Sequence, residues 1–326
     1  MARVPTGLRN ILILLLIWEI VGRMDLVASG ALPGFSEILI RLWEDRADYP
    51  RHIWATLYAS GVGFLIGNAI ALIAGVAFAM SPTLLRLFRG VNIAVFALPP
   101  IAIAPILVLT LTDMAPRIVL AALAVYFVTM TATVIGISQS DNRASDLVKA
   151  YGGSRWRILW LVQLRSALPT ITTGFQIAAP NAVLGAILAE FGGGGRWGLG
   201  TYLLGSLGRG EPDRLWGIGL IATAIAGLGY LFFALISRRL LGATRAVTLN
   251  TATPIGEAVS SPPLTRFMML IGIVSIPFLL WWAFIVIAGV PAMIAKTPFG
   301  VIDYLFFAKT APVAQEKLLQ ALSETL

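Results

Sequence analysis

The stretch between two apolar runs that decides the fold is Asp146-Leu147-Val148-Lys149-Ala150-Tyr151-Gly152-Gly153-Ser154-Arg155-Trp156-Arg157. Its order predicts a short helix, a glycine break and a second short helix rich in Arg and Trp. Gly152 can adopt the left-handed conformation that ends a helix, and Ser154 can cap the helix that follows. Leu147, Val148 and Tyr151 form an apolar patch that can fill a groove on a partner. The alternative is an ordinary interfacial loop whose Arg and Trp side chains snorkel.

The composition is that of a polytopic membrane protein, because 58% of the 326 residues are hydrophobic and only 12% are charged. The absence of cysteine excludes disulfides and thiolate chemistry, and the single histidine, His52, excludes a multi-histidine metal site. The net charge of +8 lies between apolar runs. We interpret it as loop charge that meets lipid headgroups, with no nucleic-acid partner.

Seven apolar runs approach or exceed the roughly 20 residues that cross a bilayer. They cover about 9–27, 53–79, 91–111, 117–138, 168–190, 215–237 and 267–290. The sequence therefore predicts an all-α fold, a polytopic membrane helical bundle. With the N-terminus inside, residues 146–157 lie in the cytoplasm.

Two of these runs carry distinctive residues. The second has a row of small residues four apart from Gly63 to Gly75, which predicts close approach of another helix. The third contains Pro99, Pro100 and Pro105. Prolines interrupt the backbone ladder, and the freed groups must be satisfied by neighbours or a cavity.

Three segments are not predicted to be spans of the first bundle. Residues 35–47 have helical apolar spacing and predict an amphipathic helix at the outer surface. Residues 246–265 lack periodicity and predict a cytoplasmic linker. After them, Leu279-Leu280-Trp281-Trp282 echoes Leu15-Leu16-Ile17-Trp18. The predicted domains are thus a membrane unit at 1–245 and the incomplete start of a second copy of it at 266–326, unless any two Trp-containing first spans look alike.

The 146–157 stretch resembles the EAA loop of ABC-importer permeases, the cytoplasmic elbow that docks into an ATPase. Asp146 stands for the Glu, Leu147-Val148 for the two alanines and Gly152 for the Gly, and Leu168-Pro169 matches the second Leu-Pro. Arg165 replaces an expected proline. Further short motifs of the nitrate/sulfonate/taurine-type branch follow in order over residues 1–245: Trp18-Glu19, Leu32-Pro33, Ala55-Thr56-Leu57, Gly63-Phe64-Leu65-Ile66-Gly67, Pro99-Pro100, Ala104-Pro105, Ala189-Glu190-Phe191 and Gly198-Leu199-Gly200.

The resemblance implies a type I ABC importer permease core of about six spans in the inner membrane, with a cytoplasmic N-terminus. An uncleaved first span fits this pattern better than a signal peptide. The implied partners are an ABC ATPase dimer, which would hold ATP and Mg, a substrate-binding protein and a second permease domain. The ATPase-coupling residues would be Asp146, Leu147, Val148, Ala150, Tyr151, Gly152, Ser154, Arg155 and Arg157. No GxxxxGK[ST] motif occurs, which indicates a transport subunit without catalytic residues or a cofactor of its own.

Polar residues inside spans are costly in lipid and are candidates for the translocation path. They are Asn68, Gln176, Asn181 and Glu190, and Pro180 favours Asn181 because it should open the helix locally. The alternative is a structural hydrogen bond, or simple solvation for Glu190. Residues 193–198 spell GxGxxG, but they follow a membrane helix rather than a strand, so a dinucleotide site is rejected.

The expected solute is small: a sulfonate, nitrate, taurine or a vitamin precursor. An ion-gradient-driven secondary transporter is the alternative function, but it predicts membrane-buried acids, which are scarce here beyond Glu19. An intramembrane enzyme would need a catalytic cluster, and the sequence presents no such group.

Overall fold

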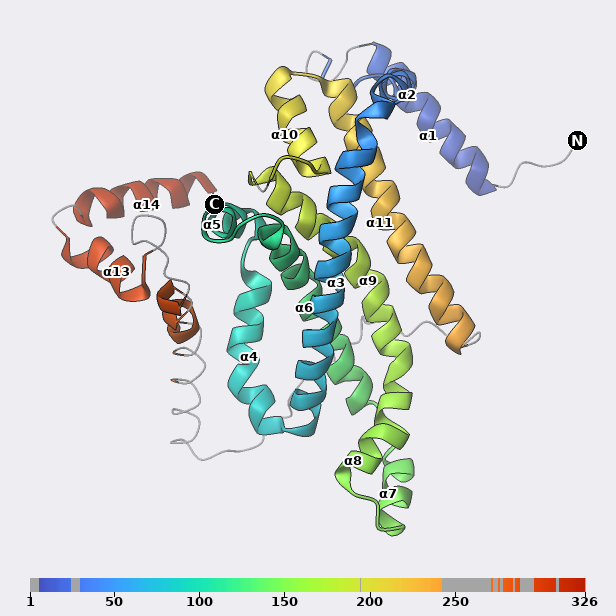
Figure 1. The fold of residues 1–326 in the computed structure, drawn as a ribbon, viewed down its shortest axis with the longest axis vertical. Helices are drawn as coiled ribbons and strands as arrows, with labels where there is room; N and C mark the ends of the chain where they lie inside the picture. Colours follow the sequence, from blue (N-terminus) through green and yellow to red (C-terminus); the bar gives the residue numbers. More distant parts are fainter. Residues whose placement is uncertain are drawn as a thin grey trace, which may run out of the picture.

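A computed structural model describes residues 6–24, 30–193, 195–241, 271, 275, 278–283, 285–287, 296–308 and 311–325. All regular secondary structure in these ranges is helical (Figure 1). The elements are α1 (Thr6–Arg23), α2 (Phe35–Glu44), a 3₁₀ turn (Asp45–Ala47), α3 (Tyr49–Met80), α4 (Pro82–Ala97), α5 (Pro100–Thr110), α6 (Ala115–Ser138), α7 (Asn142–Ala150), α8 (Arg155–Ile158), a π-helical turn (Leu159–Gln163), α9 (Leu164–Phe191), α10 (Leu199–Arg209), α11 (Pro212–Leu241), α13 (Pro298–Ile302), a π-helical turn (Asp303–Phe307) and α14 (Ala311–Thr325).

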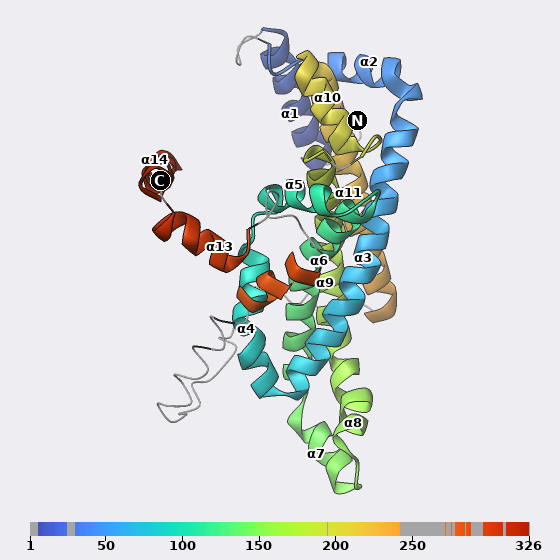
Figure 2. The same ribbon diagram turned by 60° about the vertical axis from the view of Figure 1, so that its left-hand side comes forward.

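The centre of the molecule consists of α3, α6 and α9, which run along its long axis (Figures 1 and 2). Helix α6 packs against both α3 and α9, and α11 packs against α9. The opposite ends of this bundle carry different elements: α2 and α10 lie at one end and α7 and α8 at the other. The predicted linker, 246–265, lies outside the described residues, as does most of the predicted run 267–290.

The row of small residues on α3 allows it to lie directly against α6. A Cβ added at Gly63 would lie 2.5 Å from the Ala121 Cβ, and one at Gly67 would lie 2.6 Å from the Ala122 carbonyl oxygen. The predicted close approach of a neighbouring helix is therefore confirmed. In lipid the hydrophobic effect does not drive helices together. Close backbone contact of this kind supplies the van der Waals packing that holds them together instead.

We expect Gly67→Leu to destabilise the bundle by about 1–3 kcal/mol, because the added side chain must push the α6 backbone away. The thermal stability of the purified chain in detergent measures this loss. Gly61→Leu is the matched control on the same helix, since a Cβ at Gly61 would meet nothing within 4 Å. Equal losses in the two variants would contradict the packing argument.

The predicted third span, 91–111, is not one straight helix. The chain bends by 92° between α4 and α5. Leu98 and Pro99 have extended backbones with ψ of 120° and 116°. The cause is local: a residue before proline is disfavoured in the helical region, and Leu98 and Pro99 both precede a proline. Pro105, by contrast, lies inside α5 without ending it.

Among the residues that the structure describes, length and composition identify four helices that can cross a membrane, or five when the α4–α5 pair counts as one span. They are α3, α6, the continuous stretch Arg155–Phe191 and α11, with α4–α5 as the fifth. The predicted first span is helical as α1, but it falls outside this set because Arg9, Glu19 and Arg23 are charged. Glu19 instead accepts hydrogen bonds from the backbone and side chain of Ser36 at the start of α2.

Helix α2 and its 3₁₀ turn occupy residues 35–47, where the amphipathic helix is predicted. Its inward-facing Ile38 is fully buried, whereas Ile40 and Trp43 are exposed. This helix lies across the end of the bundle rather than along it (Figure 2).

Candidate functional site

The elbow between α6 and α9 consists of α7, the glycine break and α8. The Asp141 carboxylate caps α7 by accepting from the Arg143 amide at 2.9 Å. Gly152 has φ +73°, a conformation that favours glycine. The Ser154 hydroxyl then accepts a 3.4 Å hydrogen bond from the Arg157 amide and caps α8. The predicted helix, glycine break and second capped helix are confirmed.

The elbow lies at the tip of the molecule (Figure 1), and several of its apolar and aromatic side chains are exposed. Leu147, Tyr151 and Trp156 are 59%, 83% and 62% exposed. Val148 was expected in the same patch, but it is half-buried, because its side chain lies under Gly153. Free apolar surface of this kind marks an interaction site when it is contiguous.

The rest of the elbow anchors that patch to the bundle. Ser145, Ile158 and Leu159 are buried. Asp146 and Lys149 form an exposed ion pair of 2.9 Å, which contributes little to stability on its own. The predicted coupling residues Ala150, Arg155 and Arg157 are exposed. Because α8, the π-helical turn and α9 form one continuous helical stretch, the exposed tip is joined directly to a central span.

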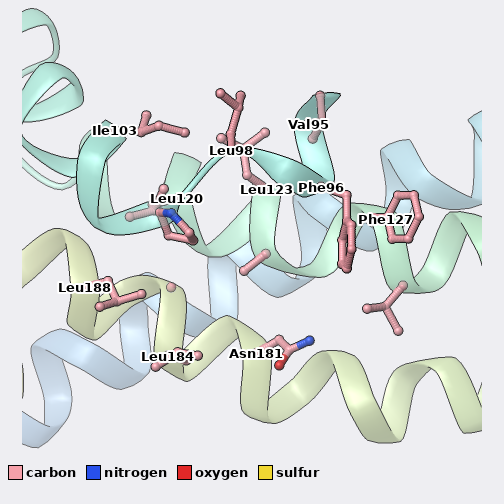
Figure 3. A pocket seen from close by; sticks show the side chains of 14 residues that line it. Val95, Phe96, Leu98, Ile103, Leu120, Leu123, Phe127, Asn181, Leu184 and Leu188 are labelled. Atoms are coloured by element: carbon pink, nitrogen blue, oxygen red, sulfur yellow. The ribbon is translucent and has the colours of Figure 1, made fainter. Parts of the chain in front are cut away.

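A cavity of about 210 Å³ lies where the α4–α5 corner meets α6 and α9 (Figure 3). Its wall consists of Val95, Phe96, Leu98, Pro100, Ile103, Leu120, Leu123, Ala124, Phe127, Val128, Asn181, Leu184, Gly185 and Leu188. Asn181 is one of the four polar residues expected along the translocation path. It follows Pro180, which α9 accommodates without a break.

The structure does not bring the other three polar candidates into this cavity. Asn68 is buried between α3 and α6, where its Oδ1 accepts a 2.6 Å hydrogen bond from Thr129 Oγ1. Its Nδ2 donates to the Phe64 carbonyl at 2.8 Å. Gln176 is half-buried on α9 and does not line the cavity. Asn68 therefore has the hydrogen bonds expected of a helix–helix contact.

Glu190 lies in a buried polar network near the end of α9. Glu190 is 0% exposed and Arg117 of α6 is 3% exposed, and their side chains approach to 3.8 Å. The Thr56 hydroxyl lies 2.9 Å from both Glu190 carboxylate oxygens, and the Gly200 amide donates to one of them at 2.9 Å. Solvation, the alternative considered for Glu190, does not fit this burial.

The glycine-rich connection between α9 and α10 is held by the same network. Arg117 donates a 2.7 Å hydrogen bond to the Trp197 carbonyl, and His52 Nδ1 lies 2.8 Å from the Gly198 carbonyl oxygen. Gly195 has φ +107°, and a Cβ there would collide with the Arg117 guanidinium. Close approach of buried charged groups, rather than a nucleotide phosphate, accounts for this glycine.

Arg117, Thr56 and His52 are structural members of this network, a role that the sequence reasoning did not assign to them. Each lies far from Glu190 in the sequence, and no short motif joins them to it. The signal available was a charged Arg117 at the edge of an apolar run.

At the end of the bundle near α2, an ion cluster joins α2 to α11. Arg214 binds the Asp45 carboxylate through Nε and Nη2 at 2.6 and 2.9 Å. Arg41 lies 3.2 Å from Asp45 and 3.4 Å from Glu211. Burial alone would raise the pKa of Asp45, but the hydrogen bond and charge of Arg214, with the charge of Arg41, hold it below its ordinary value.

We expect this cluster to lose its contribution to stability in acid. A carboxyl whose pKa is lowered by folding stabilises fully above its unfolded pKa of about 3.9 and loses that contribution as pH falls through the lower folded pKa. Asp45→Asn should therefore lower the melting temperature at neutral pH, with the difference from the unmodified chain shrinking below about pH 4. A difference that stays constant with pH would contradict the pairing.

Among the described residues, no group of three or more His, Asp or Glu side chains lies close enough to hold a metal ion. The exposed elbow and the cavity are the candidate functional sites. The buried network and the ion cluster stabilise the end of the bundle opposite the elbow.

The described part of the chain is a polytopic helical bundle with an exposed elbow joined to a central span, an architecture that suits a multi-pass membrane protein. Residues 67–245 match the family of the binding-protein-dependent transport system inner membrane component, and the chain belongs to that family. It is thus a multi-pass membrane protein and a transport component rather than an enzyme.

Curated relatives agree with this family. A probable ABC transporter permease of Haemophilus influenzae is 28% identical over 66% of this chain and 87% of its own length. A putative aliphatic sulfonates transport permease of Bacillus subtilis is 25% identical over 70% and 84%. A formylaminopyrimidine transport permease of Halalkalibacterium halodurans is 26% identical over 59% and 76%. The predicted resemblance to ABC permeases of the sulfonate/taurine-like branch is confirmed.

Proposed function

We propose that this permease imports a small solute that a binding protein delivers to the α2–α10 end, driven by a separate ATPase that docks on the α7–α8 elbow. The N-terminus and the elbow would then be cytoplasmic. The observation that carries the proposal is the elbow itself, whose exposed apolar side chains lie at the tip of a helix continuous with the central span α9.

The elbow has the properties that a mechanical coupling element needs. Its partner-facing side chains are free, whereas Ile158 and Leu159 anchor it in the bundle. Movement of α8 by a docked ATPase would be transmitted along the helix to Asn181 and the cavity. Solute access could then change without any chemistry in this chain.

Two copies of the core would enclose the pathway, supplied by a second chain or by residues 266–326 as the start of a tandem copy. The described parts of the second segment support a repeat. Helix α13 begins at Pro298, and a longer helix, α14, follows it. In the first unit, α2 begins soon after Pro33 and α3 follows it.

The ion-gradient alternative is weakened by the surroundings of Glu190. This buried acid lies beside Arg117 and accepts from Thr56 and Gly200, so its charge is already compensated. A carboxylate that binds and releases a coupling ion would need open ligand positions.

The full chain should be purified with its ATPase and binding protein and reconstituted in proteoliposomes. We expect ATP hydrolysis to rise when loaded binding protein is added and solute to accumulate only with ATP. Accumulation driven by an ion gradient without ATP would overturn the proposal.

A further inference from the structure

We propose that the cavity between the α4–α5 corner, α6 and α9 binds a neutral, flat, largely apolar solute, a small heterocycle, with Asn181 as its hydrogen-bonding contact. The cavity would discriminate against anions such as sulfonates and nitrate. The inference rests on the proposed import function and names the substrate class that this site accepts.

The cavity wall offers nothing that compensates a negative charge. None of its 14 lining residues is charged, and Asn181 is the one with a polar side chain. An ion transferred from water into such surroundings loses its hydration without gaining a partner, which costs several kcal/mol or more. A neutral apolar solute has no such cost and gains from burial against the leucine and valine side chains.

The one backbone element that could attract an anion has lost most of its donors. Pro100, the first residue of α5, lines the cavity, and helix N-termini commonly bind anions through free amide groups. Here Pro99 and Pro100 have no amide hydrogen. The amides of Ala102 and Ile103 both donate to the Pro99 carbonyl, at 3.0 and 3.3 Å. Little remains at this N-terminus for an anion to bind.

The aromatic side chains in the wall favour a flat solute. The rings of Phe96 on α4 and Phe127 on α6 are stacked, with centroids 4.3 Å apart and an interplanar angle of 27°. Both rings line the cavity (Figure 3). A planar heterocycle can extend such a stack, and aromatic pairs contribute about 0.5–1.5 kcal/mol beyond their buried area.

Asn181 supplies the polar contact. It lies on α9, across the cavity from Leu98 and Ile103 of the α4–α5 corner (Figure 3). Within the described part of the chain, its side chain has no hydrogen-bond partner, unlike Asn68. Its amide provides two donors and one acceptor oxygen, which match the donor–acceptor edge of a heterocycle. A lipid chain or an apolar side chain of a second copy would fill the wall but leave this amide unpaired, at a cost of about 1–3 kcal/mol.

Cysteine protection in the full chain tests the inference, because the chain contains no cysteine. Leu184→Cys places a thiol in the wall, and its reaction with a small neutral maleimide is followed in nanodiscs. We expect formylaminopyrimidine to slow the reaction and ethanesulfonate, a sulfonate anion, to leave it unchanged. When Asn181→Leu is added, the formylaminopyrimidine concentration needed to protect the cysteine should rise about tenfold, as expected for one lost hydrogen bond. Gln139→Leu, which removes an exposed amide outside the cavity, should not raise it.

Val128→Cys, on α6, repeats the measurement from the opposite wall, and Leu228→Cys on exposed α11 controls for direct effects on the reagent. The inference is overturned if ethanesulfonate protects as well as formylaminopyrimidine, if Asn181→Leu changes nothing, or if neither compound protects. Cysteines inert in every condition would show a cavity filled by lipid or a second copy, which also overturns it. ATP-driven coupling is measured separately, so these outcomes are independent of failure of the proposed function.

Discussion

Asp146→Lys combined with Gly152→Pro should abolish the coupling between solute delivery and ATP hydrolysis. Proline fixes φ near −65° and cannot adopt the φ of +73° found at Gly152. It also removes the amide that donates a 2.8 Å hydrogen bond to the Lys149 carbonyl. The turn that sets α8 relative to α7 would be lost, and the reversed charge would alter the surface beside Leu147.

Membrane insertion should survive this double change, because the altered residues are exposed at the tip of the elbow and contribute no side chain to the core. The measurements are copurification of the ATPase with the full chain and stimulation of ATP hydrolysis by loaded binding protein. We expect stimulation to fall to the basal rate.

Asp48→Lys is the matched control. Asp48 and Arg51 form an exposed ion pair three residues apart, as Asp146 and Lys149 do, but at the opposite end of the bundle. The Asp48 variant should keep its ATPase. Normal stimulation in the elbow variant, or equal loss of ATPase in both variants, would show that α7–α8 is not the docking site.

The elbow could be predicted from the sequence because its determinants are local. A cap residue, a glycine with a positive φ and an apolar spacing act within a few positions, so Gly152 and Ser154 carry their structural roles in the sequence itself. The close approach of some helix to α3 was predictable for a similar reason, since a row of small residues allows close helix packing in a membrane, but the sequence did not identify α6 as that helix.

The remaining features depend on residues far apart in the chain. Two adjacent prolines predict a local interruption at Pro99, but they do not predict the angle of 92° between α4 and α5. The burial of Glu190 depends on Thr56 and Arg117, which are 134 and 73 positions away. The cavity likewise arises only when α4, α6 and α9 come together. Asn68 and Asn181 look alike in sequence, and only packing gives Asn68 its partners.

Glu190→Ala should be the most damaging single substitution in the bundle. It leaves the Arg117 side chain buried without its neighbouring carboxylate and removes the acceptor used by Thr56 and the Gly200 amide. Removing one member of a buried ion pair costs about 3–5 kcal/mol. For a chain of this size we expect the melting temperature in detergent to fall by about 10 °C or more.

Glu190→Gln separates the charge from the hydrogen bonds. The amide keeps an oxygen that can accept from Thr56 and Gly200 but has no charge to set against Arg117. We therefore expect the melting temperature of Glu190→Gln to lie between those of the unmodified chain and Glu190→Ala.

Gly198→Ala tests the same network from the other side, because a Cβ there would lie 2.3 Å from the Glu190 carboxyl carbon. It should destabilise the chain and also make Trp197 more accessible to a fluorescence quencher. If Glu190→Ala has the same melting temperature as the unmodified chain, the buried network does not hold the α9–α10 connection in place.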